Sequence, residues 1–306
     1  MNATFADIHA AADFIGPGAI EVPVYQTEIF DICRRSSPFG QRIKQVPATG
    51  HPSRFFEETA IPNPGTAGFV NPRSIVAPVV SPTRVERSVP LKAIVSQINY
   101  NLFDIELGDQ QKQLAYLQAK DLVDTVSGVM VAHDVALWNG NDTSLSTPTT
   151  TQYMGAIGQI AAAGGLTTTI AGMVASNGYY ARPTAIYANP VLLDLIDQEM
   201  KSEYNVVLNT TQIAAGFTVK MLSTQAGDLP LIPDWSLPYT PGTPGSYPAY
   251  IVTEDLIEYH WLGDPAPRVF QLGLPNSLSY QYVAVKFGAP VVKGANFAHI
   301  QVNVER

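Results

Sequence analysis

The residue types that could carry out catalysis or bind a metal are few in this sequence and lie far apart. No H-x-x-x-H or C-x-x-C spacing occurs, so the ligand spacing of a zinc site is absent. The G-x-S-x-G nucleophile turn, the phosphate-binding loop and the dinucleotide-binding glycine pattern are also missing. We therefore expect no catalytic residue, no metal site and no cofactor. The histidines are His9, His51, His133, His260 and His299, and the one cysteine is Cys33.

Two adjacent pairs remain as candidates for chemistry. His133 and Asp134 could supply a general base and its orienting carboxylate, and a distant serine would complete a soluble α/β hydrolase. In a helix, however, consecutive side chains point about 100° apart, which favours a histidine in the core or at an interface. Glu57 and Glu58 could form a carboxylate pair. Neighbours on a strand face opposite ways, so a solvated strand edge is favoured there.

The composition argues against several classes of partner. The chain has 306 residues, a net charge of −8, 46% apolar residues and only 14% charged residues. A binder of nucleic acid or of an anionic membrane would need clustered Lys and Arg. Low charge instead leaves neutral surface that a large protein interface could cover. The single Cys33, expected to be a small buried side chain, permits no internal disulfide and indicates a reducing compartment.

One stretch could be mistaken for a membrane span. Residues 143–181 carry no charge, but they are rich in Thr, Ser, Gln and Gly and are interrupted by Pro148 and Gly164. A span needs about 20 mainly apolar residues, so we expect no membrane segment.

The clearest element is a long helix predicted over residues 109–138. At 1.5 Å per residue it would be roughly 45 Å long. Asp109 can cap its first amides, and Gly140 suits a left-handed exit from its last turn. Small and polar residues on its apolar stripe make it a poor coiled coil, so we expect it to support other elements of one fold. The stripe recurs at steps of three and four and consists of Ala115, Ala119, Leu122, Val126, Val129, His133 and Leu137.

A long hairpin or extended loop is predicted before this helix, at residues 47–90. Frequent prolines disfavour helix and guard an exposed strand edge. Strand-like pieces at 54–58 and 74–77 flank a turn-rich tip at 62–68. The strongest strand pattern covers 84–100. Its expected inner face is Val85, Val89, Leu91, Ala93 and Val95, opposite Glu86, Ser88, Lys92 and Ser96.

Helix and strand alternate after the long helix, over residues 146–225. We predict a helix at 166–174, a buried strand at 183–188 and a helix that begins at Asn189-Pro190, where Pro190 occupies a first-turn position. Six prolines predict a loop at 226–248. Strands are expected in the tail at 250–252, 256–259, 280–285 and 299–304.

The order of these elements resembles that of the major capsid proteins of tailed bacteriophages, which share the Hong Kong 97 fold. The resemblance is carried by the helix end Ala-Leu-Trp-Asn-Gly-Asn at 136–141, the strand running into Asn-Pro at 183–190, and the tail strand at 283–292. It covers nearly the whole chain. It implies an α+β fold with an N-terminal arm, an extended β loop, a peripheral domain with a long spine helix, and an axial α/β domain.

The resemblance also assigns these parts to the sequence. A two-stranded loop is not stable alone, which agrees with a loop that lies on a neighbouring subunit. The implied parts are an arm and short helix at 1–49, an extended loop at 50–95, a peripheral domain at 96–145 plus 262–306 with the spine helix at 109–138, and an axial domain at 146–261. The implied inter-subunit contacts are Arg54, Phe55, Phe56, Glu57, Phe69, Arg73, Ile75, Val76, Arg84 and Arg87.

The function that the resemblance implies is structural and not enzymatic. Pentamers and hexamers of such a protein form the icosahedral head shell of the virion, assembled in the host cytoplasm around double-stranded DNA that is not bound specifically. The acidic charge agrees with this, because phosphate affinity comes chiefly from Lys and Arg. Implied partners are further copies of the chain, a portal, a scaffold protein and a decoration protein. The alternative is an encapsulin-type nanocompartment shell, and a soluble α/β hydrolase is less favoured.

The sequence departs from the family pattern in two places. Some members begin with a long, charged scaffolding segment; the short arm here implies a separate scaffold protein or a self-sufficient coat. Some members also join loops to neighbours through a Lys–Asn isopeptide bond. No lysine occurs between Lys44 and Lys92, so we expect no covalent mesh.

Overall fold

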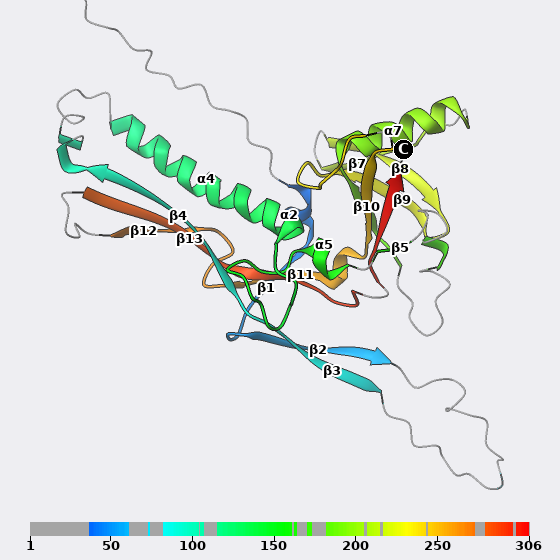
Figure 1. Ribbon diagram of the computed structural model, residues 1–306, viewed down its shortest axis with the longest axis horizontal. Helices are drawn as coiled ribbons and strands as arrows, with labels where there is room; N and C mark the ends of the chain where they lie inside the picture. The colour runs from blue at the N-terminus through cyan, green and yellow to red at the C-terminus, as the bar shows by residue number, and fades with distance from the viewer. Residues whose placement is uncertain are drawn as a thin grey trace, which may run out of the picture. The chain divides into compact units, whose positions relative to one another are not determined.

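The computed structural model describes residues 37–60, 73, 82–103, 105–106, 115–160, 162–163, 170–172, 182–204, 207–214, 217–242, 244–272, 279–295 and 298–305. These residues belong to one compact unit. They form a five-stranded sheet, a seven-stranded sheet and a separate two-stranded hairpin (Figure 1). The fold is therefore mixed α+β, as predicted.

The five-stranded sheet is built around one long strand, β13 (Ser279–Val292). Strand β4 (Lys92–Asn101) pairs antiparallel with one edge of β13, and β11 (Ile257–Leu262) and β12 (Arg268–Leu272) pair with the other edge in succession. Strand β1 (Lys44–Pro47) lies parallel beside β11. The long helix α4 (Ala115–Asn139) lies along β4 and β13 (Figure 1).

The seven-stranded sheet has a short, fully buried strand, β6 (Ala185–Ala188), at its centre. Its order is β5 (Ala162–Ala163), β14 (Ile300–Glu305), β10 (Ser246–Val252), β6 (Ala185–Ala188), β9 (Gly227–Pro233), β8 (Phe217–Thr224) and β7 (Thr210–Ala214). Every residue of β6 is buried. Helix α7 (Pro190–Ser202) follows β6 directly, and Asn189 Oδ1 accepts a hydrogen bond from the Val191 amide at 3.1 Å. The predicted strand at 183–188 and the helix start at Asn189-Pro190 are confirmed.

The apolar stripe of the long helix is confirmed in its second half, whereas Leu122 and Val126 are only half-buried. Val129, His133 and Leu137 are buried, with 1%, 2% and 0% exposure. Helix α4 ends at Asn139, one residue past the predicted end. The predicted cap Asp109 lies outside the described residues.

The predicted left-handed exit at Gly140 is wrong. The described glycines with positive φ are Gly227, Gly263 and Gly294. A Cβ on Gly140 would instead lie 2.4 Å from the Tyr153 carbonyl oxygen and 2.7 Å from the Gly155 nitrogen. The Gly155 amide donates to the Gly140 carbonyl at 3.1 Å. Glycine is needed here because two backbone segments approach closely.

The predicted strand at 84–100 is two strands, and the expected face of its second half is wrong. The chain breaks at Pro90 between β3 (Thr83–Val89), in the hairpin, and β4. In β4 the even-numbered residues are the less exposed, and Val95 is 55% exposed. Ile94 and Val95 put an apolar side chain on each face of the strand, and α4 covers the face of Ile94 rather than that of Val95.

The expected loop at 226–248 contains strand β9 and the start of β10. Pro230 lies where β9 exchanges its partner, from β8 at residues 227–230 to β6 at residues 231–233. A proline is tolerated in a strand at a point where the ladder does not require its amide. The four predicted tail strands correspond to β10, β11, β13 and β14.

The two sheets do not divide the C-terminal strands at residue 262, the boundary implied between the axial and peripheral domains. Strand β11 begins at Ile257 and belongs to the five-stranded sheet, whereas β14 belongs to the seven-stranded sheet. Residues 1–36 of the predicted arm and short helix at 1–49, which include Cys33, and the strand piece at 74–77 lie outside the described residues. Of the predicted helix at 166–174, residues 170–172 are described and are helical. No helix in the described ranges is long and apolar enough to cross a bilayer.

Candidate inter-subunit surface and buried polar sites

The stem of the predicted extended loop is an antiparallel hairpin. Strand β2 (Ser53–Ala60) pairs with β3 from Ser53↔Val89 to Ala60↔Thr83. Side chains alternate between the two faces of such a ribbon. The outward face carries Arg54, Phe56 and Glu58 with Arg84 and Glu86, and the inward face carries Ser53, Phe55 and Glu57 with Val85, Arg87 and Val89.

The outward face presents one large aromatic side chain between two ion pairs. Phe56 is 73% exposed. Arg54 Nη1 lies 3.2 Å from Glu86 Oε1, and Arg84 Nε lies 3.6 Å from Glu58 Oε2. Exposed pairs of this kind add roughly 0.2–1 kcal/mol each, so they align the ribbon more than they stabilise it. An aromatic residue rimmed by charge is typical of an interface anchor.

The inward face joins the hairpin to the five-stranded sheet. Glu57 Oε1 accepts a hydrogen bond from the Gly294 amide at 2.6 Å, and Glu57 Oε2 accepts from Arg87 Nε at 3.0 Å. The Phe55 ring lies 5.7 Å from Lys293 Nζ. The predicted solvated edge is therefore wrong for Glu57, because its face packs on the turn after β13, whereas Glu58 is exposed as expected.

A buried polar cluster lies at the root of the hairpin. Ser53 Oγ and His260 Nδ1 share a hydrogen bond of 2.7 Å, and His260 Nε2 lies 3.0 Å from Glu258 Oε2. Lys293 Nζ lies 2.7 Å from the same carboxylate oxygen. Burial opposes ionisation of Glu258, but Lys293 and His260 together hold its pKa below the usual value. Serine, histidine and carboxylate also form nucleophilic triads, yet these three residues are only 5–6% exposed, which leaves little room for a substrate.

The predicted contact residues occupy both faces of the hairpin. Arg54, Phe56 and Arg84 point outward, whereas Phe55, Glu57 and Arg87 contact the protein's own body or one another. Arg73 is exposed. Phe69, Ile75 and Val76 lie outside the described residues. Contact with a neighbouring subunit remains a prediction for all of them.

A second polar cluster closes the end of α4. Asp234, which follows β9, accepts hydrogen bonds from Trp138 Nε1 at 3.0 Å and from Ser37 Oγ at 2.5 Å through one carboxylate oxygen. The backbone and hydroxyl of Ser236 donate to the other oxygen. The Trp138 ring stacks on Phe39 of α2 (Pro38–Arg42), with centroids 4.0 Å apart. This cluster and its aromatic neighbours form a core that contacts both sheets.

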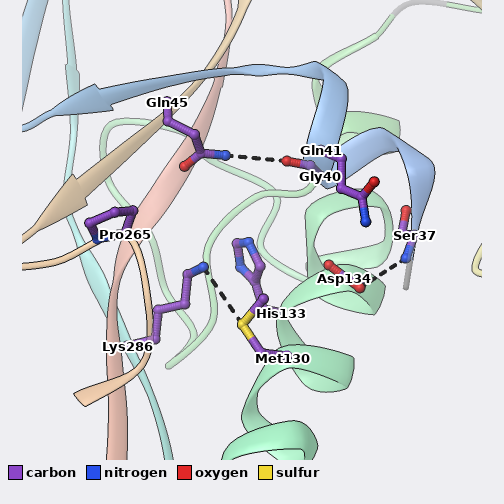
Figure 2. Close-up of a pocket in the computed structure, with 9 residues that line it drawn as sticks. All are labelled: Ser37, Gly40, Gln41, Gln45, Met130, His133, Asp134, Pro265 and Lys286. Atoms are coloured by element: carbon purple, nitrogen blue, oxygen red, sulfur yellow. Dashed lines mark hydrogen bonds between the residues drawn. The ribbon is translucent and has the colours of Figure 1, made fainter. Parts of the chain in front are cut away.

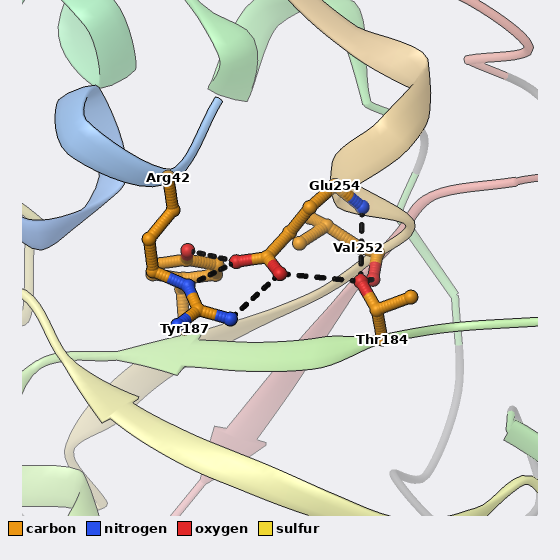
Figure 3. Close-up of polar contacts among 5 residues, drawn as sticks. All are labelled: Arg42, Thr184, Tyr187, Val252 and Glu254. Carbon is orange, nitrogen blue, oxygen red and sulfur yellow. Dashed lines mark hydrogen bonds and ion pairs between the residues drawn. The ribbon is translucent and has the colours of Figure 1, made fainter. Parts of the chain in front are cut away.

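Helix α2 is tied to the seven-stranded sheet through Arg42 (Figure 3). The Arg42 guanidinium binds Glu254 with two hydrogen bonds, of 2.5 and 2.8 Å. Tyr187 of β6 donates to the same carboxylate at 2.5 Å. Glu254 raises the pKa of Arg42, while burial and Glu254 raise the pKa of Tyr187. Bidentate pairing fixes the orientation of a guanidinium, so this contact orients α2.

The sequence-predicted His133 and Asp134 do not form a catalytic pair. Asp134 Oδ2 accepts from the Ser37 amide at 2.9 Å, while the His133 ring packs edge-on against Tyr259, with centroids 4.5 Å apart. Burial and the nearby Lys286 lower the pKa of His133 to about 3. Both residues line a pocket of about 190 Å³ together with Lys286 (Figure 2). The prediction of a core histidine is confirmed.

The face of the five-stranded sheet opposite α4 carries several large apolar side chains that are exposed. Alternation and register put five large side chains there, each 40–55% exposed. Contiguous exposed apolar patches on soluble proteins mark interaction surfaces. The five are Val95, Leu262, Phe270, Leu272 and Phe287.

Sequence reasoning missed the hairpin root and Lys286. A partial signal existed: Glu258 lies in the predicted strand at 256–259, and His260 would share its face if that strand continued by one residue. Nothing in the sequence pairs them with Ser53, which lies about 200 residues away. Within the described ranges, no group of three or more His, Cys, Asp and Glu side chains could hold a metal ion.

The fold matches several solved structures over nearly their whole length. No protein-family model and no curated protein matches the sequence. A protein of Gordonia phage Cozz is similar with a TM-score of 0.60 at 12% identity, covering 98% of this chain and 94% of that one. The capsid of a native GTA particle is similar with a TM-score of 0.62 at 12% identity, covering 95% and 98%.

A shell of another kind is also similar. The SrpI encapsulin of Synechococcus elongatus PCC 7942 matches with a TM-score of 0.55 at 12% identity, covering 96% of this chain and 94% of that one. At these identities the comparisons establish the fold. The chain has the fold of phage capsid proteins, as the sequence predicted.

Proposed function

We propose that this chain is the major capsid protein of a tailed bacteriophage. Pentamers and hexamers of it form the icosahedral head shell that encloses double-stranded DNA, and the protein acts as a structural component of the virion and not as an enzyme. The observation that carries the proposal is the match to the GTA capsid over 95% of this chain and 98% of that one. A shared fold alone does not fix function, so surface features must agree with it.

Two surface features support assembly from identical copies. The hairpin stem presents Phe56 away from the chain's own body, and the five-stranded sheet leaves five large apolar side chains exposed on one face. Heterologous contacts between copies close into rings of five or six, and permanent assemblies usually bury more than about 2,000 Å². The net charge of −8 agrees with a shell protein that does not bind DNA tightly, because phosphate affinity comes chiefly from Lys and Arg.

The parts of the shell subunit follow from the sheets. We assign the five-stranded sheet and α4 to the peripheral domain, the seven-stranded sheet and α7 to the axial domain, and β2–β3 to the extended loop that lies on a neighbouring copy. A portal, a scaffold and a decoration protein are proposed as partners, and assembly takes place in the host cytoplasm.

An encapsulin-type compartment is the second candidate, favoured by the similarity to the SrpI encapsulin. Particles purified from the native source distinguish the two. Double-stranded DNA and a portal at one vertex indicate a phage head, whereas a protein cargo indicates a compartment.

Electron microscopy of the purified, expressed chain tests the proposal. We expect closed shells, and a monodisperse monomer at all concentrations would contradict the proposal.

Deletion of residues 62–71 should leave circular dichroism and the unfolding transition of the body unchanged while abolishing shell closure. Normal shells from that deletion would remove the role assigned to the loop. Denaturing gels of the shells should show a single monomer band, since a covalent ladder would contradict the absence of isopeptide bonds.

A further inference from the structure

We propose that the pocket between α4, α2 and β13 is a binding site for a carboxylate group, with the Lys286 ammonium as its principal donor. The site is lined by residues of four segments that lie far apart in the sequence. No part of the capsid proposal requires this pocket. One of the two possible sources of the carboxylate, a neighbouring subunit, rests on that proposal.

Lys286 is a buried cation that lacks an oxygen partner among the described residues. It is only 4% exposed. Its Nζ lies 4.0 Å from Met130 Sδ and 5.2 Å from the centroid of the Tyr259 ring (Figure 2). Thioethers and aromatic faces are weak partners for an ammonium group. A buried charge without a hydrogen-bonded counter-charge is costly, so an anion in this pocket would relieve that cost.

His133 supplies the second unmet group. It is 2% exposed, and its Nδ1 has no hydrogen-bond partner within the described structure. Figure 2 shows its ring between Lys286 on one side and Gly40 and Gln41 on the other. The amide side chains of Gln41 and Gln45 also line the pocket. Gln45 Nε2 already donates to the Gly40 carbonyl at 3.3 Å, so the groups that a ligand would satisfy are the Lys286 ammonium and the His133 ring.

Size and charge favour a carboxylate over a larger or more highly charged anion. The pocket volume of about 190 Å³ accommodates a carboxylate on a short aliphatic stem. Asp134 lies on the same wall and already accepts the Ser37 amide. Its negative charge disfavours a dianion such as phosphate. Burial and Asp234 raise the pKa of Asp134, so this carboxyl can share a proton with an incoming carboxylate.

The carboxylate can come from two sources. One is a free short-chain carboxylic acid. The other is an acidic side chain of a second copy of this chain, inserted when the shell assembles; the sequence contains 26 Asp and Glu residues.

Thermal unfolding in propionate tests for the site. Dissociated wild-type subunits should melt about 1–3 °C higher in 0.1 M sodium propionate than in sodium chloride of equal ionic strength. Lys286→Met should lose this difference. Lys92→Met should retain it, because the Lys92 ammonium donates elsewhere, to the Thr150 carbonyl. The comparison of salts on wild-type protein stands even if Lys286→Met folds poorly.

Assembled shells distinguish the two sources. If a free carboxylate is the ligand, propionate also raises the melting temperature of shells. If a neighbouring side chain fills the pocket, shells do not respond to propionate. Zero-length carbodiimide coupling of shells mixed from ¹⁴N and ¹⁵N subunits then yields Lys286 peptides joined to an acidic peptide of the other isotope.

The proposal is overturned if neither subunits nor shells respond to propionate and the only coupled product joins Lys286 to Asp134 of the same chain. The pocket would then hold a solvated internal ion pair. Wild-type shells seen in micrographs alongside that result would leave the capsid proposal intact, whereas absence of shells would contradict the capsid proposal independently of the pocket.

Discussion

The strand pairs β6–β10 and β2–β3 are both antiparallel, yet they differ in how far their side chains are buried within the chain. Every residue of β6 and nearly every residue of β10 is buried within the chain. The hairpin instead has one face on its own body and one face exposed. The first pair draws its stability from the subunit alone, whereas the second leaves an aromatic side chain available to another surface.

The largest expected effect is in the buried pair. Ile251 is 0% exposed and lies opposite Ile186. Ile251→Ala should lower the free energy of unfolding by about 2–5 kcal/mol, from lost transfer free energy and the cavity left behind. Urea unfolding of dissociated subunits measures this loss. Val85→Ala on the hairpin, where the side chain is 39% exposed, is the matched control and should cost less than about 1 kcal/mol. Equal losses would remove the contrast between the two pairs.

Acid should weaken the body rather than the hairpin. The pKa of His133 is lowered from 6.5 to about 3 by burial and by Lys286. Below pH 6.5, His133 is therefore protonated in the unfolded chain but stays neutral in the folded chain until the pH nears 3. Stability due to this group falls as pH drops from 6.5 towards 3, by about 2 kcal/mol at pH 5. Urea unfolding at pH 7 and pH 5 should show this loss, and His133→Gln should reduce it. An unchanged pH slope in His133→Gln would contradict the assignment.

Removing a glutamate from the inward face of the hairpin should lower the free energy of unfolding by about 1–2 kcal/mol, more than removing one from the outward face. Glu57→Ala leaves the buried Gly294 amide without its acceptor, and an unpaired buried donor costs about that much. Glu58→Ala on the adjacent residue removes only an exposed ion pair and should cost less than about 1 kcal/mol. Urea unfolding compares the two variants directly. A larger cost for Glu58→Ala would reverse the assignment of the faces.

The smallest effect on the isolated chain is expected at Phe56. Phe56→Ser should change the unfolding free energy by less than about 0.5 kcal/mol, because the ring is 73% exposed. The same variant should reduce the yield of closed shells in electron micrographs. Wild-type yield would show that this aromatic side chain does not anchor the hairpin to a neighbour.

The spacing of apolar residues along the sequence predicted those helices and strands in which buried residues recur at a regular interval. The long helix, the strand into Asn189-Pro190 and the tail strands were found because each shows its apolar face or cap in consecutive residues. The pattern failed in β4, where the neighbours Ile94 and Val95 are apolar on opposite faces, so only the position of α4 decides which face is covered. It also failed at Gly140, where the constraint is a backbone segment about 15 residues away.

The candidate sites were less predictable than the fold. The His133 stripe position indicated a core residue correctly. The partners that define each site come from distant segments: Lys286 beside His133, Ser53 beside His260, and Ser37 beside Asp234. Electrostatic and hydrogen-bonding contacts at such separations leave no periodic trace in one sequence.

The sequence by itself determined the order of the elements, the acidic and weakly charged character of the chain, and the resemblance to tailed-phage capsid proteins. These depend on residue type and local spacing, which act before the chain is packed. Only the tertiary structure decided which side of each strand is covered, that Glu57 is anchored while Glu58 is not, and that a buried lysine and histidine face one pocket. These depend on which distant segments meet, and that is set when the two sheets pack against α4 and α2.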